Sequence, residues 1–174
     1  MSKKKSLIYS FAALVVLIGL DQLTKQMAVK YLYQQKPVEI IPGVFELNFL
    51  VNRGAAFGIL QNHQIFFAVI TCIVLCVLVY VYVRIPCVHK YAPFHILLVL
   101  LTAGAAGNFL DRVRLGYVID FFYFKLIDFP IFNVADCYVV VSVILLAVLI
   151  LLVYKDKDLD ELGAFIKPSR RKDL

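Results

Sequence analysis

Two long stretches without a charged residue limit the fold more than any other feature of the chain. Residues 65–83 contain neither a charge nor a proline, and residues 137–154 are likewise uncharged. A helix needs roughly 20 apolar residues to cross the hydrocarbon core of a bilayer. Each stretch therefore predicts a membrane-spanning helix.

Two further stretches predict spans that carry a few polar residues. Residues 92–110 are apolar apart from His95 and Asn108. Residues 6–30 begin with an apolar run, and the pattern continues past Asp21. We therefore expect four membrane-spanning helices.

The composition agrees with a membrane protein. Hydrophobic residues make up 62 % and charged residues 17 %, whereas a soluble domain is nearer half apolar and a quarter charged. The 174 residues suffice for one domain, 1–174. The net charge of +6 would suit nucleic acid, but the basic residues lie at chain ends and in loops, as membrane topology requires. We expect a membrane all-α fold and no nucleic-acid partner.

The basic residues also predict the orientation. Most of the 18 fall in segments that should share one side: Lys3, Lys4, Lys5, Arg84, Lys90, Lys155, Lys157, Lys167, Arg170, Arg171 and Lys172. Because cytoplasmic segments carry the excess of lysine and arginine, we expect both termini in the cytoplasm, with the tail 155–174 as a solvated extension. The lysines before the first span would also suit a cleavable signal peptide, but no small-x-small site precedes Asp21.

Residues 31–64 and 113–135 should then lie outside the cytoplasm. Within the first segment, Phe45 to Asn52 alternates between apolar and polar residues, interrupted by Leu50. This period of two indicates a strand, and we expect a small extracytoplasmic β-sheet on the membrane surface. The second segment is rich in tyrosine and phenylalanine, which favour the membrane–water interface.

Eight polar residues are expected together at the outer ends of the spans or in the outer segments. They are Asp21, Asn52, Asn108, Asp111, Arg112, Asp120, Asn133 and Asp136. Ionisable groups near lipid are costly and tend to be functional. Chance would divide such residues between both membrane faces, so their convergence indicates a site.

Two of these residues have an ordinary structural alternative at the start of the fourth span. Asn133 could cap the helix, with Asp136 in its first turn. Such a cap and a functional role can coexist, because the end of a helix dipole is a good place to hold a carboxylate.

Other members of the set also have structural alternatives. Asn108 and Arg112 share a helix face, and Arg112 could only snorkel towards the interface. Asp111 is expected to form a surface pair with a neighbouring arginine. Asp21 and Lys25 have the i,i+4 spacing of a helical ion pair.

Asp120 is the hardest of the eight to explain structurally. Its neighbours are apolar or aromatic, and it has no evident local partner or capping role. Two adjacent carboxylates can share a proton, so that one acts as a base towards water while the other acts as an acid. Asp120 and Asp136 are the candidates for such a pair.

The cysteines and histidines predict no metal site or disulfide framework. Cys72, Cys76, Cys87 and Cys137 show no CxxC or Cys/His zinc spacing. They suit buried thiols that pack as small apolar residues. No cofactor is expected.

Five short segments carry a family resemblance. They are Asp21–Lys25 (DQLTK), Asn52–Gly58 (NRGAAFG), Gly107–Arg112 (GNFLDR), Gly116–Phe121 (GYVIDF) and Phe132–Asp136 (FNVAD). In this order they resemble the lipoprotein signal peptidases, or type II signal peptidases. Two departures are minor: Arg53 stands where many members carry Thr or Asn, and Cys137 where Ser is common.

The resemblance implies an intramembrane aspartic endopeptidase of the bacterial inner membrane. It would cleave diacylglyceryl-modified prolipoproteins just before the lipidated cysteine, at the extracytoplasmic face. Its partners would be these substrates and membrane lipids, and a monomer is expected. Carried over by motif, the catalytic pair is Asp120 and Asp136, and the substrate-binding or supporting residues are Asp21, Asn52, Gly54, Asn108, Arg112 and Asn133.

Rival functions fit the sequence less well. A proton-coupled transporter would show inverted repeats or helices broken at mid-membrane, and neither is visible. A metal-dependent hydrolase would place histidines at ligand spacing beside the aspartates, but His63, His89 and His95 are isolated. A purely structural subunit would not need five polar motifs at one surface.

Overall fold

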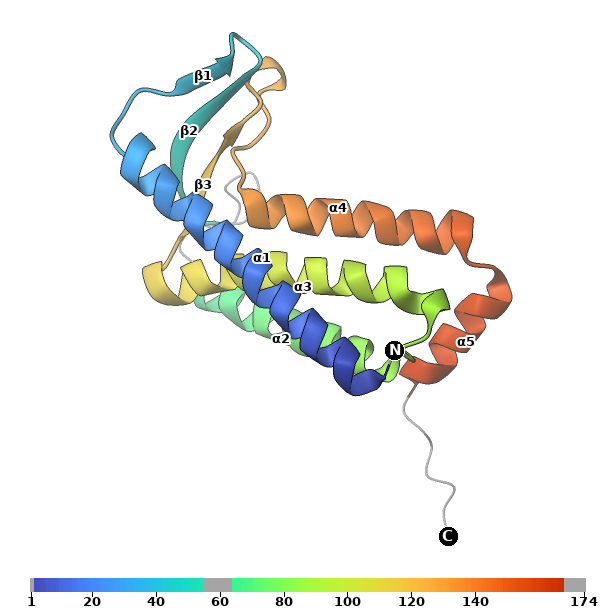
Figure 1. Ribbon diagram of the computed structural model, residues 1–174. Helices are drawn as coiled ribbons and strands as arrows, with labels where there is room; N and C mark the ends of the chain where they lie inside the picture. The colour runs from blue at the N-terminus through green and yellow to red at the C-terminus, as the bar shows by residue number, and fades with distance from the viewer. Residues whose placement is uncertain (1, 55–63, 168–174) are drawn as a thin grey trace.

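The computed structural model describes residues 2–54 and 64–167, and within them four helices are long and apolar enough to cross a membrane. They are α1 (Lys3–Leu32), α2 (Gln64–Arg84), α3 (Ala92–Leu115) and α4 (Val134–Val148), which continues through a π-helical turn, Leu149–Val153. Figure 1 shows these four helices as a bundle with a small sheet beyond one end. The predicted fold class is therefore confirmed.

The helix surfaces are apolar on the outside, as a lipid solvent requires. Large apolar side chains such as Ile65, Val140 and Leu152 are exposed. Contiguous exposed apolar surface of this kind is rare on soluble monomers and marks membrane contact. Inside the bundle, by contrast, several polar side chains are buried, including Asp21, Lys25 and Asn133.

The sheet has three antiparallel strands in the order β1 (Val38–Ile41), β2 (Phe45–Asn52) and β3 (Val118–Tyr123). The alternation in the sequence located β2 correctly, whereas β1 and β3 were not distinguished from their surrounding segments. Gly43 lies in the β1–β2 turn with φ +71°, a left-handed conformation that glycine adopts easily.

Apolar packing fixes the sheet to the end of α1. Ala28 and Leu32, in the last turns of that helix, pack with Ile119 and Phe121 of β3. This contact places the middle of β3 directly beyond the bundle, at what we call its sheet end (Figure 1).

Small residues bring α3 and α4 together below the sheet. A Cβ atom on Gly104 would lie 2.5 Å from the carbonyl oxygen of Ala135 and 2.8 Å from Val139 Cγ2. A Cβ atom on Gly107 would lie 2.6 Å from Asp21 Oδ2. The run of small residues from Ala103 to Gly107 therefore allows a close approach of α3 to α4 and α1, since only glycine leaves room for these neighbours.

The interpretation of the tail as a solvated extension was wrong for its described part. Residues Asp156–Ile166 form a helix, α5, at the end opposite the sheet (Figure 1). Leu162 of α5 is buried against Ile85 and Tyr91, and Lys90 forms an ion pair with Asp158 at 2.6 Å. The spacing of apolar residues along the helix gives it a face that must be covered. Residues 168–174 lie outside the described part.

Replacement of Gly104 by alanine tests the helix packing. The added Cβ atom would force α3 and α4 apart, and overpacking of this kind typically costs about 1–3 kcal/mol. Gly104→Ala should therefore lower the thermal unfolding temperature in detergent and reduce activity. Gly19→Ala is the matched control, because no atom of the part of the chain that the structure describes lies within 4 Å of a Cβ atom at that position. Equal stability of the two variants would contradict the packing described here.

Candidate active site

Asn133 caps α4 and also contacts the polar residues at the sheet end. Its side-chain oxygen accepts from the Asp136 N–H at 3.0 Å, and Asp136 Oδ2 accepts from the Asn133 N–H at 3.1 Å. This reciprocal pair is a capping box. The Asn133 amide nitrogen lies 2.6 Å from Asp120 Oδ1. The cap was predicted, and the same side chain links the two aspartates.

Asp120 lies in the middle of β3 and is only 1 % exposed. Besides Asn133, it accepts from Asn52 Nδ2 on β2 at 2.9 Å. The Gly54 N–H donates to Asn52 Oδ1 at 3.0 Å, and this bond directs the Asn52 amide nitrogen towards Asp120. The hydrogen-bond donors to Asp120 thus come from β2 and from the start of α4, and not from its neighbours in the sequence.

Asp136 receives a second donor, this time a side-chain amide, from α3. Asn108 Nδ2 lies 2.7 Å from Asp136 Oδ1, and Asn108 Oδ1 accepts from Asn133 Nδ2 at 3.0 Å. The amides of Asn108 and Asn133 therefore connect the two carboxyl groups through one hydrogen-bond network. Arg112, one turn beyond Asn108, donates to its backbone carbonyl at 3.4 Å.

Burial raises the pKa of Asp120 to about 6, well above the ordinary value of 3.8. The charge of Asp136 is the second cause of this rise, while the donors from Asn52 and Asn133 lower the pKa. Asp120 is therefore a carboxyl group that can hold a proton close to neutral pH.

A buried ion-pair cluster around Lys25 lies next to this network. Lys25 Nζ lies 2.9 Å from Asp21 Oδ2 and 2.9 Å from Asp111 Oδ2. Asp21 also accepts from the Ala135 N–H at 3.0 Å, which ties α1 to the first turn of α4. The predicted pair of Asp21 and Lys25 is confirmed, although it is buried.

The expected surface pair of Asp111 with an arginine was wrong. Asp111 is 2 % exposed and contacts Lys25, and it also accepts from Gln22 at 2.9 Å and from the Ile119 N–H at 3.3 Å. Sequence reasoning also missed Gln22 and the central place of Lys25. The spacing of Asp111 three residues after Asn108 was the available signal, since it puts both on one helix face.

The two carboxyl groups line a cavity of about 780 Å³. Its polar lining includes Asn52, Arg53, Asn108, Arg112, Asp120 and Asp136, beside Gly54. Its apolar walls come from the 129–132 segment and from Val139, Val140 and Val141 of α4. A polar floor with apolar walls suits a substrate that is itself partly apolar.

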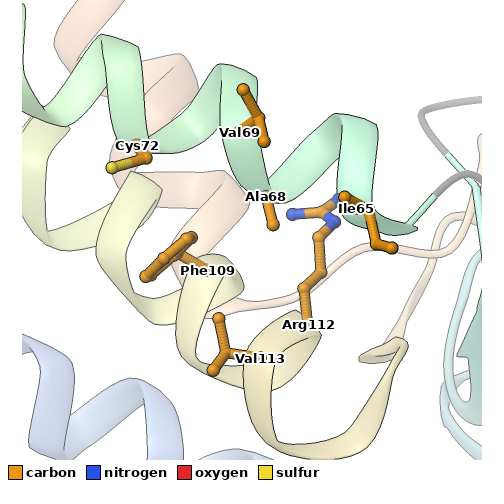
Figure 2. Close-up of a pocket in the computed structure, with 7 residues that line it drawn as sticks. All are labelled: Ile65, Ala68, Val69, Cys72, Phe109, Arg112 and Val113. Carbon is orange, nitrogen blue, oxygen red and sulfur yellow. The ribbon is translucent and has the colours of Figure 1, made fainter.

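Arg112 also lines a second, smaller hollow of about 400 Å³ between α2 and α3. Figure 2 shows its guanidinium group directed towards Ile65 and Ala68 of α2. The group lies 5.5 Å from the centre of the Phe67 ring, and its buried Nε atom has no hydrogen-bond partner among the described residues. Arg112 therefore lies between the cavity that the carboxyl groups line and this second, apolar hollow.

The structure brings together the polar set that the sequence singled out. Each of the predicted site residues lies in the hydrogen-bond network or lines the cavity: Asp21, Asn52, Gly54, Asn108, Arg112, Asp120, Asn133 and Asp136. Residues 55–58 of the second motif lie outside the described part. Over residues 2–54 and 64–167, no group of three His, Cys, Asp or Glu side chains is placed to hold a metal ion.

Comparison with known proteins places the chain in a family. The family model described as signal peptidase (SPase) II matches residues 13–152. The chain belongs to the signal peptidase II family. This family member is therefore a peptidase, and its four apolar helices fit a multi-pass bacterial membrane protein.

Curated relatives and solved structures agree with the signal peptidase II assignment. The lipoprotein signal peptidase of Streptococcus thermophilus is 43 % identical over 146 residues, covering 84 % of this chain and 92 % of that protein. That of Caldanaerobacter subterraneus is 45 % identical over 135 residues, covering 77 % and 90 %. A solved bacterial membrane enzyme matches with a TM-score of 0.73 and 33 % identity over 95 % of this chain and 94 % of that one.

The raised pKa of Asp120 predicts how stability depends on pH. Because its folded value of about 6 exceeds the ordinary 3.8, the folded state binds more protons in this window, and the unfolding free energy falls as pH rises through it. The loss is on the order of 2–3 kcal/mol. Asp120→Asn removes this titration. The unfolding temperature of the variant should therefore increase relative to that of the wild type as pH rises from about 4 to about 7.

Circular dichroism is the suitable probe, because the chain contains no tryptophan. Asp160→Asn, on the exposed side of α5, should follow the wild-type pH dependence. Parallel pH curves for the wild type and Asp120→Asn would contradict a raised pKa at Asp120.

Proposed function

We propose that Asp120 and Asp136 form the catalytic pair of an aspartic endopeptidase that removes signal peptides from prolipoproteins. The observation that carries this proposal is the amide of Asn133, which binds both residues at the floor of a cavity with apolar walls. Two carboxyl groups held in one buried network can share a proton, and this is the requirement of aspartic chemistry. The relatives' name supplies the substrate class.

The environments of the two carboxyl groups favour different roles. Asp120, with its raised pKa, holds the proton, donates it to the carbonyl oxygen of the scissile bond, and takes it back when the tetrahedral intermediate collapses and the C–N bond breaks. Asp136 accepts a proton from the attacking water and later passes it to the leaving amine. Its position in the first turn of α4 favours a carboxylate, because the positive end of the helix dipole lies there.

The remaining site residues hold the pair and the substrate. Asn52 and Gly54 fix Asp120 from β2, and Asn108 fixes Asp136 from α3. The sheet serves as a cradle for the extended residues around the scissile bond. Arg112 offers donors to substrate carbonyl groups from the wall of the cavity.

The apolar walls support a substrate that carries a lipid. Val140 and Val141 line the cavity and are also exposed on the outer surface of α4, so the cavity opens towards lipid. A diacylglyceryl group on the cysteine after the scissile bond can remain in the membrane and fix the depth of that bond. The second hollow, beyond Arg112 (Figure 2), offers an acyl chain an apolar surface beside the cavity.

Charge supports an orientation with the site outside the cytoplasm. Basic residues at the ends of α1, α2 and α4, among them Lys3, Arg84 and Lys155, lie at the end opposite the sheet (Figure 1). The excess of positive charge marks the cytoplasmic side. We infer that both termini are cytoplasmic, that the sheet end faces outwards, and that residues 1–174 act as a single monomeric domain.

Neutralising either aspartate tests the mechanism. Asp120→Asn and Asp136→Asn preserve side-chain shape but prevent proton sharing, so each should lower kcat by about 10³-fold or more. The assay follows release of the signal peptide from a lipidated prolipoprotein by the purified protein, with Asp160→Asn as a folded control of full activity. Near-normal turnover in either aspartate variant would overturn the pair. Loss of wild-type activity on chelation, restored by one divalent ion, would favour metal chemistry.

A second experiment tests the lipid requirement. Each buried methylene of an acyl chain contributes about 0.8 kcal/mol to membrane anchoring, and misplacement of the reacting group by about 1 Å can lower the rate roughly a hundredfold. We therefore expect cleavage of the diacylglyceryl-modified prolipoprotein but not of its unlipidated precursor. Comparable cleavage of both, at matched concentrations in one bilayer, would refute the lipid requirement and leave the aspartic mechanism intact.

A further inference from the structure

Lys25 directs all of its donors at defined acceptors inside the bundle. Besides its bonds to Asp21 and Asp111, its Nζ atom lies 2.9 Å from Asn108 Oδ1. An ammonium group has three donors and no acceptor. The atom of Asn108 that faces Lys25 must therefore be its carbonyl oxygen.

Asn108 transmits this constraint to both carboxyl groups. With its oxygen towards Lys25, its Nδ2 atom faces Asp136 Oδ1 at 2.7 Å. The same oxygen accepts at 3.0 Å from Asn133 Nδ2, which lies 2.6 Å from Asp120 Oδ1. A half-turn of the Asn108 amide would place its NH₂ group against two donors and its oxygen against a carboxylate. Lys25 makes that orientation unfavourable.

We propose that Lys25 is a positioning residue that fixes the orientation of the Asn108 and Asn133 side-chain amides. In this orientation both members of the aspartate pair receive N–H donors. The inference rests on the proposed aspartic mechanism. Among the described residues, Lys25 forms no hydrogen bond or ion pair with either carboxyl group of the pair, and its link to them runs through the two amides.

The proposal has a signature that a purely structural role would not produce. N–H donors stabilise the charged form of a carboxyl group. If the amides could rotate, the pair would ionise at higher pH, and the whole pH–rate profile would shift upwards. Other charged groups lie around the pair, namely Asp21 on α1, Asp111 and Arg112 on α3, and Arg53 after β2. The test must therefore hold the local net charge constant.

A double variant, Lys25→Gln with Asp111→Asn, meets this condition. It removes one positive and one negative charge, and glutamine can either donate to Asn108 or accept from it. With the lipidated prolipoprotein we expect kcat to fall about 10- to 100-fold and the pH optimum to rise by about one unit. KM should change less than about twofold, because no residue that lines the cavity is replaced. Asp111→Asn alone retains Lys25 and removes one negative charge, which favours ionisation of the pair, so its pH optimum should not rise.

A wild-type kcat and pH optimum in the double variant would overturn the proposal, and so would an equal pH shift in Asp111→Asn. Lys25→Arg covers the case in which the double variant fails to fold. A guanidinium group can only donate, so this variant should keep the wild-type pH optimum, and a shifted optimum would overturn the proposal. Turnover by Asp120→Asn would instead refute the aspartic mechanism itself, so the two failures are distinguishable.

Discussion

A carboxylate inside a membrane bundle must be surrounded by hydrogen-bond donors, and the rest of the structure follows from this requirement. Water is scarce there, and an unpaired charge is costly. Asp136 therefore lies at a helix N-terminus, with the Asn133 N–H and the Asn108 amide as donors. The donors to Asp120 come from β2 and from the start of α4. These donors belong to β2, α3 and the start of α4, so the three elements must converge.

The convergence explains otherwise unrelated features of the sequence. Gly104 and Gly107 let α3 approach α4 and α1 closely enough for the hydrogen bonds to form. The contact of Ala28 and Leu32 with β3 holds the sheet at the correct height. Lys25 balances the charges of Asp21 and Asp111, which would otherwise be two unpaired carboxylates inside the bundle.

Local patterns predicted much of this arrangement, because they depend on neighbours in the sequence. Span lengths placed Asp21, Asn108 and Asp136 near one membrane face, and alternation located β2. What sequence reasoning missed depends on distant contacts. The partner of Asp111 is 86 positions away on α1, and α5 is stabilised by the loop that precedes α3. No local pattern specifies such partners, and the five motifs were needed to give the candidate pair of Asp120 and Asp136 a catalytic role.

The proposed mechanism requires a proton on Asp120 that the pair can share. Infrared difference spectroscopy of the detergent-solubilised protein measures it directly, because a protonated carboxyl group has its own C=O stretching band. A raised pKa at Asp120 predicts a band that is present below pH 6, disappears as pH rises through about 6, and is missing in Asp120→Asn. The same pH-dependent band in both proteins would contradict it.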